Sequence, residues 1–182
     1  MSIWEPLEIS MMEKTVLVQG LREIDPSHPY GPELFDALAR LTVSVAIEAV
    51  CLRLNPQSRN VEVYLVKRSE TETAYPGEWH CPGTVIRPGE EFSSAFERLS
   101  RKEFGAKFLE TRFVSNLNHP TEARGHFLSM VYLCILGETS GALRGQWFPV
   151  KALPEKTVIH HRVRVIPTAV GAFVAENTQV CE

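Results

Sequence analysis

The chain has 182 residues, which is enough for one domain with a sizeable hydrophobic core and too few for two comfortable ones. Its net charge is −3 and no run is rich in lysine or arginine, so no nucleic-acid-binding surface is indicated. No apolar stretch approaches the roughly 18–20 residues that cross a bilayer, no signal-peptide pattern opens the chain, and its four cysteines show no paired spacing, so we expect a cytoplasmic protein without a membrane partner.

Residues 1–41 are predicted to form an N-terminal arm and a short helix. The arm contains a candidate strand over 15–18, and Pro32 suits the first turn of a helix over 33–41. An arm of this kind can exchange across a homodimer, so a homodimer is one expectation for the assembly.

Residues 42–178 are predicted to form the main domain. Alternating apolar residues favour a β-hairpin made of 42–54 and 61–67, followed by strands over 110–117, 127–136 and 146–150. Apolar residues at helical spacing over 163–174 predict a C-terminal helix. Strands that surround two or three helices predict an α+β fold, an α/β/α sandwich whose mixed β-sheet is flanked by helices.

The most informative stretch is residues 75–106, YPGEWHCPGTVIRPGEEFSSAFERLSRKEFGA. A loop rich in glycine and proline leads into a helix whose apolar face has the spacing i, i+3, i+4, i+7. Glu90 stands at the helix start, where the helix dipole favours negative charge, and Gly105 is a typical helix stop. Leu99 completes the apolar face, so its simplest interpretation is a core contact.

This stretch resembles the signature of the Nudix hydrolase superfamily, which is Gly, five residues, Glu, seven residues, then Arg-Glu-hydrophobic-any-Glu-Glu-any-Gly-hydrophobic. The spacing fits residues 84–106 without an insertion, and four positions match: Glu90, Arg98, Glu103 and Gly105. Four positions depart from the signature: Thr84, Leu99, Ser100 and Lys102. Thr84, Glu90 and Gly105 are therefore expected to be structural positions of a degenerate Nudix box.

The resemblance implies that glutamates at positions 99, 102 and 103 bind magnesium or manganese, which activates water to attack a diphosphate linkage. Only Glu103 supplies an oxygen here, so it is the candidate catalytic residue and metal ligand, with Glu122 or Glu138 as a further acid. Lys102 places a positive charge where the metal's charge would lie, which disfavours a metal held by the protein alone.

Several of these residues have a simpler interpretation. Lys102 is either a solvated helix residue or a direct phosphate ligand. Arg98, a second candidate phosphate ligand, is expected to form an ion pair with Glu90 or Glu103. Glu122 is expected to be a solvated charge in the polar loop NHPTEARGH.

Two histidine-containing pairs, His80-Cys81 and His160-His161, contain zinc-ligand residue types but close no four-ligand set. Adjacent histidines on a strand or helix are also expected to point apart, which disfavours a zinc site.

The resemblance implies a Nudix-type pyrophosphohydrolase that acts on a nucleoside diphosphate linked to another moiety, with an impaired metal site. The alternative is a catalytically inactive Nudix-like domain, a pseudoenzyme, that binds a nucleotide-type ligand or a protein partner. In both cases the expected partner is a nucleotide-type small molecule, and magnesium or manganese is the expected cofactor of the hydrolase.

Overall fold

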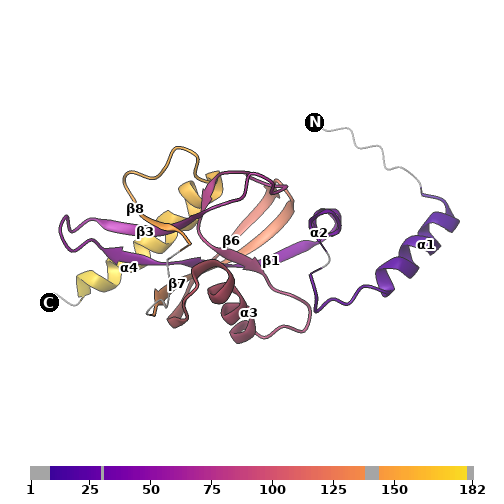
Figure 1. Ribbon diagram of the computed structural model, residues 1–182, viewed down its shortest axis with the longest axis horizontal. Coiled ribbons are helices and arrows are strands. Elements are labelled where there is room, and N and C mark those ends of the chain that lie inside the picture. Colours follow the sequence, from indigo (N-terminus) through magenta and orange to yellow (C-terminus); the bar gives the residue numbers. More distant parts are fainter. Residues whose placement is uncertain (1–8, 30, 138–143, 180–182) are drawn as a thin grey trace.

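A computed structural model describes residues 9–29, 31–137 and 144–179 (Figure 1). Its helices are α1 (Met11–Arg22), α2 (Pro32–Ala39), α3 (Phe92–Leu99) and α4 (Ile166–Gln179), with the π-helical segments η1 (Ser100–Phe104) and η2 (His161–Val165). Its strands are β1 (Val43–Val50), β2 (Leu52–Leu54), β3 (Val61–Lys67), β4 (Trp79–His80), β5 (Gly83–Val85), β6 (Phe108–Glu122), β7 (Gly125–Leu136) and β8 (Gln146–Pro149). None of the described helices is long and apolar enough to cross a membrane.

Two sheets make up the centre of the molecule. The first has the strand order β5-β1-β7-β6, in which β1 and β7 run parallel and the other pairs are antiparallel. The second has the order β2-β3-β4, with β8 also paired to β3. The prediction of a mixed α/β fold is confirmed. The predicted hairpin is partly right, because β3 pairs with the short β2 while β1 pairs with β5 and β7.

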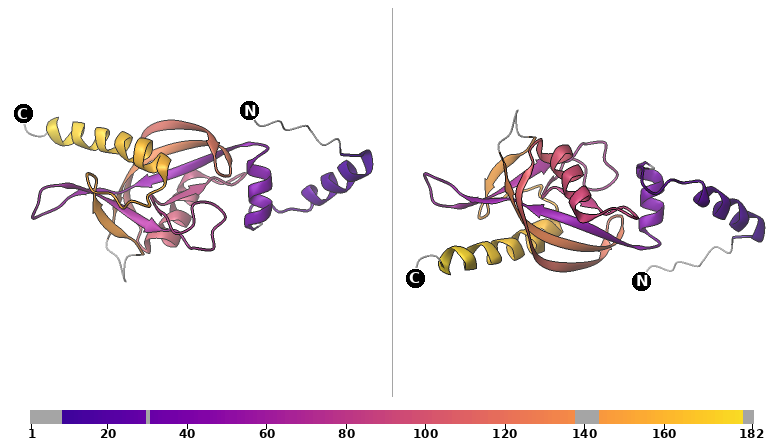
Figure 2. Two further views of the ribbon diagram at one scale, coloured as in Figure 1. Left: turned by 90° about the horizontal axis from the view of Figure 1, so that it is seen from above. Right: turned by 90° about the horizontal axis from the view of Figure 1, so that it is seen from below.

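Helices α3 and α4 lie on opposite sides of the sheet layer (Figure 2). The alternation of side chains along β1 explains how one strand serves both sides. Ile47 and Ala49 join the core that contains residues of α3, whereas Val50 joins the core that contains residues of α4. Glu48, between Ile47 and Ala49, therefore belongs to the α4 side.

Two local predictions are wrong. The candidate strand over 15–18 lies within α1, because Ser10 and Glu13 form a reciprocal capping box that starts a helix. α1 has no buried residue and stands apart from the sheets (Figure 1). The polar loop after residue 117 is also mostly strand, since β6 continues to Glu122 and β7 starts at Gly125.

Candidate functional site

A cavity of about 500 Å³ opens on the face of the first sheet that carries Glu48. Small residues make room for it on three neighbouring strands, Ala46 on β1, Gly83 on β5 and Ser129 on β7. A Cβ atom on Gly83 would lie 2.6 Å from Glu48 Oε2 and 2.9 Å from the Ile47 carbonyl oxygen, so this position requires glycine. We call Ala46, Glu48, Gly83 and Ser129 the cavity floor.

The walls of the cavity combine aromatic and cationic side chains. The aromatic residues come from α2, from the loop after β3 and from β7: Phe35, Tyr75 and Phe127. The cationic residues come from four different segments: Arg68, Arg87, Arg98 and Arg124. Aromatic faces stack on planar groups, and guanidinium groups match phosphate geometry, so the lining suits an anionic ligand with a planar moiety.

Arg98 ties the box helix, residues 92–104, to the loop that precedes it. Its Nε and Nη2 donate to both carboxylate oxygens of Glu90 at 2.8 and 2.7 Å. Its Nη1 donates to Thr84 Oγ1 at 2.5 Å, and Nη2 also donates to the Val85 carbonyl at 3.1 Å. The hydrogen bonds from Arg98 lower the pKa of Glu90. Of the two expected ion pairs, the structure contains the one with Glu90.

The end of the box helix follows the family spacing as well. Gly105 adopts a left-handed conformation with φ +67° and donates to the Ser100 carbonyl at 3.0 Å, which ends the helix as predicted. Thr84, Glu90 and Gly105 thus all lie at points where the box loop or helix is held together.

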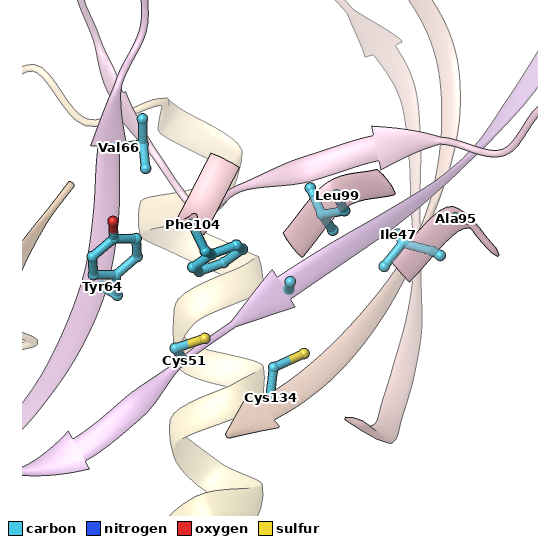
Figure 3. Packing of buried hydrophobic residues seen from close by; sticks show 9 residues of the cluster. Ile47, Cys51, Tyr64, Val66, Ala95, Leu99, Phe104 and Cys134 are labelled. Carbon is cyan, nitrogen blue, oxygen red and sulfur yellow. The ribbon is translucent and has the colours of Figure 1, made fainter. Parts of the chain in front are cut away.

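Leu99 is a core residue, as its spacing predicts. It is 1% exposed and belongs to the cluster that contains Ile47, Ala95 and Phe104 (Figure 3). A glutamate at this position would be directed into packed apolar side chains. The position therefore contributes to core packing where the family signature has a metal ligand.

Lys102 and Glu103 form an ion pair with each other, with Lys102 Nζ 3.2 Å from Glu103 Oε1. The Lys102 side chain is 75% exposed and that of Glu103 is 18% exposed. Magnesium and manganese prefer several oxygen ligands. One carboxylate that is already paired with a lysine does not fit such an ion, and among the described residues that line the cavity neither Lys102 nor Glu103 appears.

Glu122 lies at the end of β6 and not in a solvated loop, so that expectation is wrong. Its side chain is 13% exposed, the Tyr75 hydroxyl donates to its Oε2 at 2.6 Å, and His160 Nδ1 lies 2.9 Å from its Oε1. Burial acts to raise the pKa of Glu122, but the close contact with His160 and the hydrogen bond from Tyr75 outweigh it and lower that pKa. The other candidate acid, Glu138, lies outside the described residues.

The carboxylate of the cavity floor is not among the site residues predicted from the sequence. Glu48 is 7% exposed; Ser129 Oγ donates to its Oε1 at 3.1 Å, and His161 Nε2 lies 3.6 Å from its Oε2. Burial raises the pKa of Glu48 to about 8, against the effect of the Ser129 hydrogen bond. The available signal was an acid in the middle of an otherwise apolar strand, VSVAIEAV.

The adjacent histidines do not point apart as expected. The rings of His160 and His161 meet edge to face with centroids 4.4 Å apart, and both line the cavity. Together with Glu48 they form the one group among the described residues whose three ligand atoms lie within 4.8 Å of one another.

The tautomer of His161 argues against a metal in this group. Its Nδ1 accepts a hydrogen bond from the Cys81 backbone N–H at 2.9 Å, so a neutral ring carries its proton on Nε2, the atom that faces Glu48. A metal-binding histidine instead donates its second ring N–H to an acceptor. Burial lowers the pKa of His161 well below its usual value, which keeps the ring neutral. The group therefore does not fit a metal ligated by His161.

A scan of protein families matches the NUDIX domain over residues 45–169. Similar solved structures include Shewanella oneidensis NrtR, with 15% identity and a TM-score of 0.59; the match covers 72% of this chain and 63% of that chain, less than two thirds of its length. A MutT NUDIX hydrolase from Burkholderia pseudomallei has 22% identity and a TM-score of 0.55 over 67% of this chain and 95% of that chain. The NUDIX domain of S. oneidensis NrtR, solved in complex with ADP ribose, has 16% identity and a TM-score of 0.57 over 86% and 97%. A search of curated proteins finds no match.

Proposed function

The chain belongs to the Nudix family, and from that premise we propose that it binds an anionic, nucleotide-type ligand in the cavity and does not use the box helix for metal-dependent hydrolysis. The observation that carries this proposal is the contrast between two parts of the site. The cavity has about 500 Å³ of space with aromatic and cationic walls. The box helix has one carboxylate at the three positions where the family places metal ligands.

The charge of the lining supports a phosphate-containing ligand that needs no metal. Arg87, Arg98 and Arg124 bring guanidinium groups to the cavity. Part of this charge is already balanced, since Arg98 pairs with Glu90 and Arg124 lies 3.3 Å from Asp36. Arg87 has no carboxylate within ion-pair distance in the described part of the chain; its Nη1 donates to the Ser27 carbonyl at 2.9 Å, so it is the guanidinium best placed to bind a phosphate.

ADP ribose is the first ligand to test, because the NrtR NUDIX domain of similar fold was solved with it. NrtR was also solved with a 27mer DNA. The present chain has a net charge of −3 and no basic run, so we propose a small molecule and not DNA as its ligand.

The proposal is tested by calorimetric titration of ADP ribose and ADP into the protein, once with EDTA and once with magnesium. We expect binding in both buffers. Arg87→Ala should weaken it about tenfold, which corresponds to the loss of one charged contact of about 1.4 kcal/mol. Arg101→Ala is the matched control, because Arg101 is an exposed arginine of η1 whose partner is Glu97. Binding that occurs only with magnesium would overturn the proposal.

Hydrolysis remains the second candidate function because Glu103 keeps the family position and part of its carboxylate is exposed. Magnesium often binds through one or two carboxylates together with phosphate oxygens of the substrate. This candidate predicts product release that requires magnesium or manganese and is abolished by Glu103→Gln while ligand binding persists. Product formation at the rate of buffer alone would exclude it for the substrates tested.

A further inference from the structure

The polar groups of the cavity floor have no role in the proposed phosphate contacts. Glu48 is held from β7 by the Ser129 hydroxyl, and His161 of η2 lies beside it. Gly83 of β5 packs directly against the same carboxyl group. Three different elements therefore fix the position of one buried acid at the bottom of the cavity.

Glu48 has no cationic partner in this position. Across the described residues, His161 is its only basic neighbour within 4.0 Å, and that ring is neutral. Charged groups act on it from further away, Glu122 of β6 with a repulsive effect and Arg68 after β3 with an attractive one. His80 of β4 is buried and neutral, and His160, which directly precedes η2, has a ring nitrogen within 4.8 Å of the Glu48 carboxyl group. A buried carboxylate without a partner is costly in free energy, so the group retains its proton at neutral pH.

In the structure Ser129 Oγ donates to Oε1, and in that arrangement the proton of the neutral acid lies on Oε2. The floor then presents an O–H donor on Oε2 next to an acceptor on Oε1, with the Nε2–H of His161 as a further donor 3.6 Å from Oε2. An uncharged donor beside an uncharged acceptor matches the hydrogen-bonding edge of an uncharged heterocycle and does not match a phosphate.

We propose that Glu48, as a neutral carboxylic acid, forms with His161 a base-reading subsite that pairs with a heterocycle edge carrying an acceptor beside a donor, such as N1 and the 6-amino group of adenine. This inference rests on the proposed function and adds which end of a nucleotide occupies the floor. A side chain with one donor and one acceptor pairs with such an edge through two hydrogen bonds, as Asn and Gln do with adenine.

The test is the affinity for ADP between pH 6.5 and 9.5 in EDTA, measured by calorimetry for the wild type, Glu48→Gln and Glu48→Ala. The wild-type affinity should fall about tenfold per pH unit above pH 8, because the ionised acid loses its donor. Glu48→Gln keeps one donor and one acceptor, so its affinity at pH 7 should stay within about threefold of the wild type and should not change with pH. Glu48→Ala should bind at least tenfold more weakly at pH 7.

Two controls separate this subsite from the rest of the cavity. Pyrophosphate has no base, so at pH 7, where Glu48 is neutral, its affinity should be the same in the wild type and in Glu48→Gln. The ADP analogue without the 6-amino group should bind the wild type more weakly and should lose less affinity than ADP when Glu48 is replaced by alanine.

The outcomes distinguish this inference from the proposed function. If no variant binds ADP or ADP ribose at any pH, the proposed function fails. If ADP binds and the wild-type affinity does not change between pH 7 and 9.5, or if Glu48→Gln abolishes binding at pH 7, the neutral acid is not the reading group. Glu48→Gln is nearly isosteric, so the test holds even if Glu48→Ala does not fold.

Discussion

The box helix and the cavity floor differ in the kind of residue that they keep: the box helix keeps structural residues, and the cavity floor keeps a buried polar group. The box helix keeps the family's structural residues, since Arg98 binds Glu90 and Gly105 ends the helix. At two of the three positions where the family places metal ligands it has a core leucine and an exposed lysine. The cavity floor shows the reverse, because Glu48 lies outside the box and is nonetheless a buried polar group at the bottom of a pocket. A motif that keeps its spacing therefore indicates that the loop and helix are formed. It does not by itself indicate where the functional side chains lie.

The largest expected effect concerns Leu99, whose substitution tests whether that position is part of the core. Leu99→Ala should lower the free energy of unfolding by about 2–5 kcal/mol, because it leaves a cavity among closely packed side chains. Urea unfolding measures the effect, and Ser94→Ala, at an exposed position of α3, is the matched control. A loss below about 1 kcal/mol would show that position 99 is free to serve another role.

The next effect concerns Arg98, which joins the helix to the box loop. Arg98→Ala should cost about 1–3 kcal/mol of stability, because it removes the charged donor that binds both oxygens of the Glu90 carboxylate and the Val85 carbonyl. Arg98→Lys should not restore the loss, since an ammonium group cannot make the two-pronged contact. In the same urea assay the exposed Arg101→Ala should stay within about 0.5 kcal/mol of the wild type. Equal effects of the two alanine substitutions would contradict a special role for Arg98.

The Arg98–Glu90 pair also predicts a loss of stability in acid. The folded-state pKa of Glu90 is lowered, so its contribution is present above the unfolded value of 4.5 and is lost as pH falls through the folded value. Arg98→Ala should remove this part of the acid sensitivity. Unfolding curves between pH 3 and 6 test this, and parallel pH dependence in wild type and variant would contradict it.

The third effect is the pH dependence of stability, which has opposite signs for Glu48 of the cavity floor and Glu90 of the box. The folded-state pKa of Glu48 is raised, so its contribution to stability is lost as pH rises from about 4.5 to about 8. His80 and His161 have lowered pKa values and lose stability only as pH falls below about 6.5. Between pH 6.5 and 8 the wild type should therefore lose up to about 1.4 kcal/mol per pH unit relative to Glu48→Gln. Equal slopes for the two proteins would mean that the acid is already ionised at neutral pH.

The smallest expected effect concerns the hydroxyl of Tyr75, which donates to Glu122. Tyr75→Phe should cost about 0.5–1.5 kcal/mol, because it removes one hydrogen bond to a partly buried carboxylate. Tyr132→Phe is the matched control, since no hydrogen bond of the Tyr132 hydroxyl occurs in the described part of the chain. A Tyr75→Phe variant as stable as Tyr132→Phe would indicate that Glu122 is solvated after all.

Much of the fold follows from the sequence for identifiable reasons. The apolar period from Phe92 to Leu99 specifies the box helix, and the glycine that follows specifies its end, because only a left-handed residue fits there. The mixed sheet follows from β-branched runs bounded by turn residues. These patterns are local, so neighbouring residues along the chain carry them.

The candidate site was less predictable, because long-range pairing creates it. Glu122 was expected in a loop because its segment of the sequence is polar. The pairing of β6 with β7 nevertheless extends the strand through that segment. Glu48 meets Ser129 and His161 only after β1 has paired with β7 and η2 has packed nearby. The helix around 15–18 was missed because its start depends on a capping box upstream, between Ser10 and Glu13.

If the cavity binds its ligand without hydrolysing it, equilibrium dialysis of labelled ADP ribose will recover the ligand intact. The protein would be dialysed first in EDTA and then with added magnesium and manganese, and the retained label would be identified by chromatography. We expect retained, intact ADP ribose in both buffers. Retention only with metal, or conversion of the label to a phosphate-containing product that Glu103→Gln abolishes, would contradict it.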